Sequence, residues 1–115
     1  MSSYVEAAPG QNEAVFQDQK GVECGQWEPI VNIMDPYVQE LGRFAVMENN
    51  KNTMGHLKFI CVIKGWTQVV AGKNYRLIIE ACNGLGFPGT YEAIVYVKPW
   101  EKTWELIEFI PLLRN

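Results

Sequence analysis

Three segments in the second half of the chain alternate between apolar and other residues with a period of two. The apolar positions are odd-numbered in all three: Leu57, Phe59, Cys61 and Ile63, then Tyr75, Leu77, Ile79 and Ala81, then Tyr91, Ala93, Val95 and Val97. Successive side chains of a strand point to opposite faces of a sheet, so this period predicts strands with one apolar face. We expect an antiparallel sheet that buries its odd-numbered side and leaves the other side in water.

One segment before these strands has the helical period instead. The Asp35-Pro36 dipeptide predicts its start, because aspartate accepts free backbone N–H groups and proline needs no N–H in the first turn. Apolar residues then recur every three or four positions to about Asn50, which predicts a helix that covers the apolar side of the sheet. Short strands near residues 27–32 and 106–109 would complete an α+β fold of four or five antiparallel strands wrapped around one helix.

The length of 115 residues and the hydrophobic content of 48% suit one domain with a core of its own. Residues 1–22 lack periodicity, so we expect a flexible leader followed by a single domain over residues 23–115. The net charge of −3 argues against nucleic acid as a partner, and no apolar stretch approaches the ~20 residues that span a bilayer. The first residues do not resemble a signal peptide, which leaves a cytosolic protein and a processed secreted protein as alternatives.

Residue types that carry catalysis or bind metals are scarce. The three cysteines, Cys24, Cys61 and Cys82, have no C-x-x-C spacing, and parity places Cys61 on the buried face and Cys82 on the outer one. Free thiols are therefore expected, with neither a disulfide nor a zinc site. His56 is the only histidine and has no carboxylate or cysteine beside it in the sequence, which favours a surface residue over a catalytic one. The sequence predicts no enzyme and no cofactor.

Two connections between the expected strands carry apolar residues where polar turn residues are usual. Val69-Val70-Ala71 precedes the break at residues 72–74, and Pro99-Trp100 opens the last connection. Periodicity alone favours valines that continue a strand before a turn at residues 72–74, although a strand over residues 57–71 would far exceed the usual ~5–6 residues. For Trp100 the sequence leaves two alternatives open, an exposed binding residue and a side chain that covers the edge of the core. In a meander these two connections emerge at one end of the sheet, where apolar tips would form a partner-binding surface.

Three stretches together resemble the plant cystatins, and the likeness runs from about Gly25 to Phe109. They are Leu41-Gly42-Arg43-Phe44-Ala45-Val46 on the helix, Gln68-Val69-Val70-Ala71-Gly72 in the first hairpin and Pro99-Trp100 in the second. The resemblance implies a reversible, tight inhibitor that blocks the cleft of papain-like cysteine proteases, either of the plant itself or of herbivores and pathogens. Its protease-binding residues would be Gly25, Gln68, Val69, Val70, Ala71, Gly72, Pro99 and Trp100.

The sequence departs from the family pattern at two glycine positions. Gly42 replaces the usual alanine, and Gly25-Gln26 stands where the family often has two adjacent glycines, so backbone freedom there would depend on Gly25 alone. Two other outcomes stay open beside the expected monomeric inhibitor. The same scaffold could serve as a plain binding or storage protein, or the first hairpin could open into an inactive domain-swapped dimer.

Overall fold

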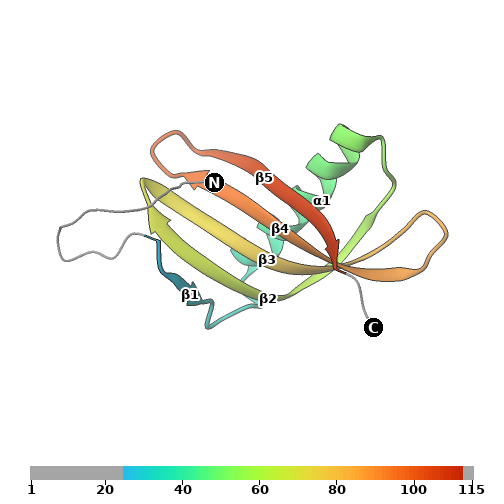
Figure 1. Ribbon diagram of the computed structural model, residues 1–115, viewed down its shortest axis with the longest axis horizontal. Coiled ribbons are helices and arrows are strands. Elements are labelled where there is room, and N and C mark those ends of the chain that lie inside the picture. The colour runs from blue at the N-terminus through green and yellow to red at the C-terminus, as the bar shows by residue number, and fades with distance from the viewer. Residues whose placement is uncertain (1–24, 113–115) are drawn as a thin grey trace.

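The computed structural model describes residues 25–112, and the leader predicted at residues 1–22 lies outside them. One antiparallel sheet contains its strands in chain order: β1 Trp27–Pro29, β2 Lys58–Val70, β3 Gly72–Cys82, β4 Pro88–Lys98 and β5 Thr103–Leu112. A single helix among these residues, α1 Pro36–Thr53, lies across one face of that sheet (Figure 1). The predicted α+β architecture is confirmed, with five strands.

α1 begins at Pro36, as the sequence predicts, and ends at Thr53, three residues beyond the predicted end at about Asn50. The carboxylate of Asp35 caps the start by accepting a hydrogen bond of 3.0 Å from a backbone N–H of the first turn. The helix stops after Thr53, because Met54 takes a left-handed conformation with φ of 57°. Asn50 does not terminate the helix. Its side chain instead bonds the N–H and the carbonyl of Leu57, at 3.0 and 2.8 Å, and so ties the helix end to the start of β2.

The hydrophobic core lies between α1 and the covered face of the sheet. Its residues are at most 8% exposed: Val38, Leu41, Ala45, Val46, Val62, Tyr75, Leu77, Ile79, Ala81, Ala93, Val95 and Val97. Odd-numbered residues of β3 and β4 supply seven of them, as the alternation predicts. Gly42 brings the helix close to β2, because a Cβ there would overlap a methyl group of Val62 and stand 2.9 Å from the ring of Phe59.

β2 does not keep the predicted parity. Its pairing with β3 skips Ile60 and Ile63, so each of them forms a β-bulge. A bulge inserts one unpaired residue and changes which positions face the core. Val62 is consequently buried, whereas Ile63, which the alternation placed inside, is 43% exposed. Cys61 pairs with Glu80 of the outer face, so its predicted place on the buried face is wrong.

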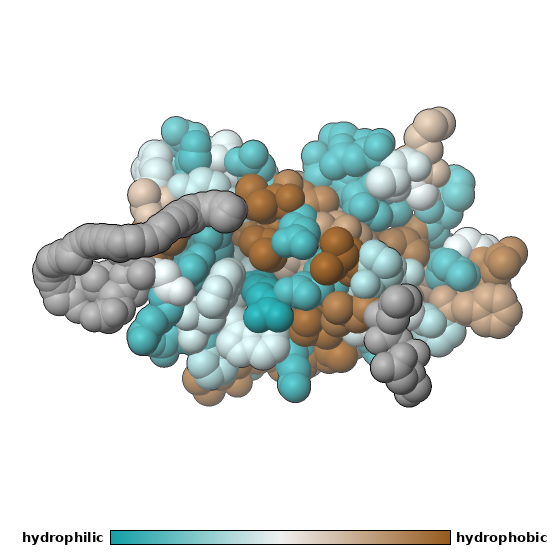
Figure 2. Space-filling model, viewed as in Figure 1, coloured by the Kyte–Doolittle hydropathy of each residue, from teal (hydrophilic) through white to brown (hydrophobic). Residues whose placement is uncertain are grey.

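The outer face of the sheet is less polar than the sequence suggests. Three isoleucines, Ile78, Ile94 and Ile110, lie on this face. Each pairs with a charged residue of a neighbouring strand, Ile78 with Lys64, Ile94 with Glu108 and Ile110 with Glu92. The guanidinium of Arg76 forms an ion pair with the Glu92 carboxylate among them. Figure 2, which views this face, shows apolar and polar side chains intermingled over the strands. The helix therefore covers one face of the sheet, and the other face is amphipathic.

Replacing Gly42 with alanine is expected to destabilise the protein. Overpacking costs about 1–3 kcal/mol, and alanine regains only about 1 kcal/mol of helix propensity. The free energy of unfolding, measured with urea, should fall by up to about 2 kcal/mol. Combining the change with Val62→Ala relieves the closer overlap, so the double variant should lose clearly less than the sum of the two single losses. Additive losses would contradict this account of Gly42.

Tyr75 makes stability sensitive to alkaline pH. Burial raises the pKa of its phenol above the ordinary value, and the nearby Tyr37 and Asp35 raise this pKa further. Above about pH 10 the unfolded chain releases this proton while the folded protein keeps it, so stability is lost as pH rises. We expect the free energy of unfolding to fall less steeply between about pH 9 and pH 11 in a Tyr75→Phe variant than in the wild type. Equal slopes would show that Tyr75 contributes nothing.

Candidate functional site

The predicted site residues come from three segments at one end of the sheet (Figure 1). Gly25 precedes β1, Ala71 lies in the turn between β2 and β3, and Pro99-Trp100 lies in the turn between β4 and β5. β1 runs beside the end of β2, with Trp27 paired to Gln68. The β3–β4 connection lies at the opposite end of the sheet. All eight predicted residues are thus brought together.

The first hairpin is tighter than periodicity alone predicts. β2 continues through Val70, β3 begins at Gly72, and Ala71 alone connects them. Val69 and Val70 continue the strand as periodicity predicts, but the turn predicted at residues 72–74 is wrong, because these residues belong to β3. β2 spans 13 residues and contains two bulges, which bend the strand and increase its local twist. The hairpin ends in an apolar tip on which Val69 is 46% exposed and Val70 is half-buried.

The second hairpin presents Trp100 to solvent. Two backbone hydrogen bonds hold its turn, from the N–H of Glu101 to the carbonyl of Lys98 at 3.1 Å and from the N–H of Lys102 to the carbonyl of Pro99 at 3.3 Å. Trp100 is 61% exposed, so the alternative that it covers the edge of the core is wrong.

Trp104 is the tryptophan that covers the core edge near this hairpin. Its ring meets the rings of Phe44 and Tyr37 edge-on, with centroids 5.5 and 5.8 Å apart. The two tryptophans are four residues apart in the chain but differ in environment, because Trp104 belongs to β5 and faces α1 whereas Trp100 lies in a turn beyond the sheet.

Gln68 joins the segment before β1 to the first hairpin. Gly25 takes a φ of 103°, in the region that favours glycine, and its carbonyl accepts a hydrogen bond of 3.0 Å from Nε2 of Gln68. Oε1 of Gln68 in turn accepts a bond of 2.8 Å from the side chain of Asn74. The hydroxyl of Tyr96 donates to the carbonyl of Ala71 at the hairpin tip. Sequence reasoning missed Asn74 and Tyr96, because only the register of β2, β3 and β4 brings them here.

Histidine, cysteine and acidic side chains form no metal-binding group in the described part of the chain. Residues 25–112 contain no group of three or more His, Cys, Asp or Glu side chains that could hold a metal ion. His56 is exposed, Cys61 and Cys82 are free thiols, and Cys24 lies outside the described residues. No helix in the described part of the chain is long and apolar enough to cross a membrane.

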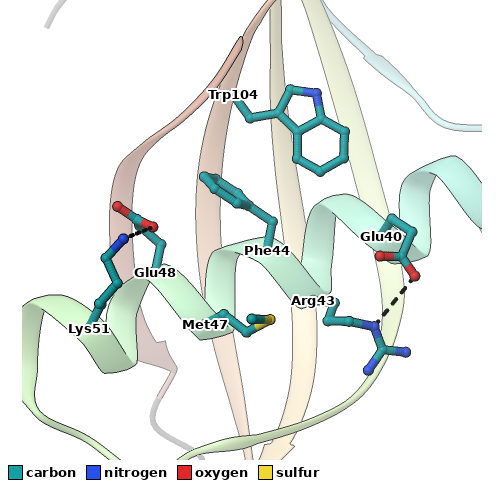
Figure 3. A pocket seen from close by; sticks show the side chains of 7 residues that line it. All are labelled: Glu40, Arg43, Phe44, Met47, Glu48, Lys51 and Trp104. Atoms are coloured by element: carbon teal, nitrogen blue, oxygen red, sulfur yellow. Dashed lines mark ion pairs between the residues drawn. The ribbon is translucent and has the colours of Figure 1, made fainter. Parts of the chain in front are cut away.

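A shallow groove lies on the helix side of the fold (Figure 3). Its lining consists of Glu40, Arg43, Phe44, Met47, Glu48, Lys51 and Trp104. Phe44 and Trp104 supply aromatic surface, and ion pairs of 3.4 Å between Arg43 and Glu40 and 3.7 Å between Lys51 and Glu48 lie along the helix. None of the predicted site residues lines this groove, so it is separate from the apolar tips.

Comparisons with known proteins point to one family. Residues 30–112 match the family model described as "SQAPI: Aspartic acid proteinase inhibitor". The chain is 51% identical over 87 residues to "Cysteine proteinase inhibitor 5" of Arabidopsis thaliana, covering 76% of this chain and 71% of that protein. It is 45% identical over 95 residues to "Cysteine proteinase inhibitor 1" of Actinidia chinensis, covering 83% and 81%.

Solved structures share the fold. A salivary cystatin from the soft tick Ornithodoros moubata superposes with a TM-score of 0.68 at 21% identity, over 77% of this chain and 98% of that one. Dimeric human cystatin F gives a TM-score of 0.65 at 21% identity, over 86% and 96%. The arrangement of the sheet and the helix, the motifs of the two hairpins and the identities to plant relatives all indicate the same family. The chain therefore belongs to the plant cystatins, a family of proteinase inhibitors and not of enzymes.

Proposed function

We propose that this protein inhibits papain-like cysteine proteases by inserting a wedge into their active-site cleft. The wedge consists of the segment at Gly25, the first hairpin tip over residues 68–72 and the second hairpin at Pro99-Trp100. The observation that carries the proposal is the convergence of these segments at one end of a rigid sheet, with apolar side chains exposed on both hairpins. The names of the plant relatives, cysteine proteinase inhibitors at 51% and 45% identity, support the target class.

The apolar tips explain why such a wedge would bind tightly. Burial of apolar surface in a protease cleft gains roughly 25 cal/mol per Å². The ladder between β2 and β3 extends to Val70 and Gly72, so the tip already has a defined conformation before binding. Little conformational entropy is then lost on docking, which allows an interface of the usual ~1,600 Å² to bind tightly.

The shape of the first hairpin also explains inhibition without cleavage. The chain reverses at Ala71, with Val70 and Gly72 paired across the turn. A peptide bond is cleaved only when its carbonyl carbon lies about 3–3.5 Å from the attacking thiolate in the correct orientation. A reversed tip cannot lie extended through the cleft like a substrate, so it occupies the site without presenting a bond for attack.

A titration of active papain with the full chain tests the proposal. Hydrolysis of a fluorogenic peptide should fall in proportion to added protein and reach zero near one equivalent. Pepsin, an aspartic protease, is the comparison enzyme, because the matching family model bears the description of an aspartic proteinase inhibitor. Full papain activity at several equivalents would overturn the proposal and favour the plain binding or storage protein. Loss of pepsin activity alone would overturn it in favour of aspartic proteases.

The oligomeric state needs to be measured on the same sample. Opening of the first hairpin would exchange β-strands between two chains and would turn the tip at Ala71 into a straight segment. Such a dimer would lack the central part of the wedge. Size-exclusion chromatography beside the titration should assign the inhibitory activity to the monomer peak, and activity confined to a dimer peak would contradict the hairpin as the binding element.

A further inference from the structure

A row of polar side chains on the outer face of the sheet connects the three segments of the wedge. Gln68 of β2 pairs with Asn74 of β3, and Asn74 pairs with Tyr96 of β4, so the three lie side by side just behind the hairpin tip. We propose that Asn74 and Tyr96 are positioning residues, which set the orientation of the wedge for protease binding without forming its apolar contact surface. This inference rests on the proposed function.

Asn74 acts through the amide of Gln68. A glutamine amide has one accepting oxygen and one donating nitrogen, and rotation by half a turn exchanges them. The bond of 2.8 Å from Nδ2 of Asn74 holds Oε1 of Gln68 on the β3 side. Nε2 of Gln68 is thereby directed to the carbonyl of Gly25, 3.0 Å away. Asn74 thus fixes the orientation of the Gln68 amide, so that its nitrogen faces Gly25 and holds the segment before β1 against the first hairpin.

Tyr96 acts on the first hairpin tip from the neighbouring strand. Its hydroxyl donates to the carbonyl of Ala71, the residue that forms the turn. The tip also lies against β4 at Gly72, where an added Cβ would stand 2.6 Å from the carbonyl oxygen of Val97 and 3.1 Å from a ring carbon of Tyr96. The hydrogen bond and this close packing together restrain the tip.

The same tyrosine ring contacts the base of the second hairpin. The ammonium of Lys98 lies 5.9 Å from the centre of the Tyr96 ring, within the range of a cation–π interaction. Lys98 also forms an ion pair of 3.7 Å with Glu101, which neighbours Trp100 in the turn. Tyr96 therefore contacts both hairpins, and its hydroxyl bonds only the first.

These restraints matter for affinity because strand pairing alone leaves some freedom in how the first hairpin tip and the segment before β1 are oriented relative to each other. Binding must then select the one arrangement that fits the cleft, and the fraction of molecules that hold it scales the affinity. A restraint made before docking lowers that cost without adding any contact to the protease. Loss of one such hydrogen bond should weaken inhibition by about three- to tenfold.

The test is a set of inhibition constants for papain with single and double variants of the full chain. Tyr96→Phe removes the hydroxyl and leaves the ring beside Lys98, and Asn74→Ala removes the donor to Gln68. Each should weaken inhibition about three- to tenfold while the protein stays fully folded under the assay conditions. Tyr91→Phe, the same chemical change nearer the other end of β4, is the matched control and should inhibit like the wild type.

Coupling between variants separates positioning from a general structural role. Because Asn74 acts through Gln68, adding Asn74→Ala to Gln68→Ala should cause no further loss, whereas adding Tyr96→Phe should lower affinity further by its own factor. In the free protein, NMR order parameters of residues 70–72 should fall in Tyr96→Phe and stay unchanged in Tyr91→Phe.

Unchanged inhibition constants, or losses that follow lowered stability, would overturn this inference while leaving the proposed function intact. The proposed function fails by a different result, namely full papain activity in the presence of excess wild-type protein.

Discussion

Replacing Val70 with aspartate is expected to weaken inhibition of papain by at least about a hundredfold. Val70 is half-buried at the tip of the first hairpin and pairs with Gly72 across the turn. In the proposed complex its side chain enters an apolar cleft, where an unpaired carboxylate would be buried without compensation. Transfer of such a charge from water costs several kcal/mol, and each 1.4 kcal/mol changes affinity tenfold. The inhibition constant against papain is the measurement.

Val31→Asp is the matched control for this change. Val31 is fully exposed in the connection between β1 and α1, so the same substitution there adds a charge without entering the wedge. It should leave the inhibition constant unchanged, and both variants should keep the far-ultraviolet circular dichroism of the wild type. Tight inhibition by a folded Val70→Asp variant would mean that the first hairpin tip is not in the cleft.

Replacing Trp100 with alanine is expected to give the second largest loss, about ten- to a hundredfold in the inhibition constant. Its indole is 61% exposed, and the turn that carries it is held by backbone hydrogen bonds that need no side chain of Trp100. The free protein should therefore keep its stability. Tryptophan is enriched among residues that dominate binding energies, because its large surface is desolvated at little cost in entropy.

Two comparison variants show whether Trp100→Ala weakens inhibition by removing a contact to the protease or by lowering the stability of the protein. Leu85→Ala removes an exposed apolar side chain from the β3–β4 loop, at the other end of the sheet, and should not affect inhibition. Trp104→Ala removes the partly buried ring that packs on Phe44 and Tyr37, and should lower the free energy of unfolding by about 2–3 kcal/mol, less than for a fully buried ring. An unchanged inhibition constant for Trp100→Ala would remove the second hairpin from the wedge.

Much of the fold follows from local patterns. The odd-numbered residues of β3 from Tyr75 to Ala81 and of β4 from Ala93 to Val97 are all buried, as the period of two predicts. The cap at Asp35 also forms where expected. Such features depend on neighbours within a few residues, so one chain segment contains the information that specifies them.

The errors occur where distant segments decide the outcome. The predicted alternation is wrong in β2, because two bulges in its pairing with β3 change which residues face the helix. Val62 consequently packs beneath Gly42. The helix also runs past Asn50, whose side chain bonds the backbone of Leu57 just before β2. Neither partner can be read from a single segment.

The same division applies to the candidate site. The sequence by itself determined the elements, the apolar character of the two hairpin tips and the family motifs that place Val70 and Trp100 in them. Only the tertiary structure decided that Trp100 is exposed to solvent, that Asn74 bonds Gln68 and that Tyr96 bonds the carbonyl of Ala71. The physical reason is that strand register sets which side chains meet across the sheet, and register depends on bulges and helix packing.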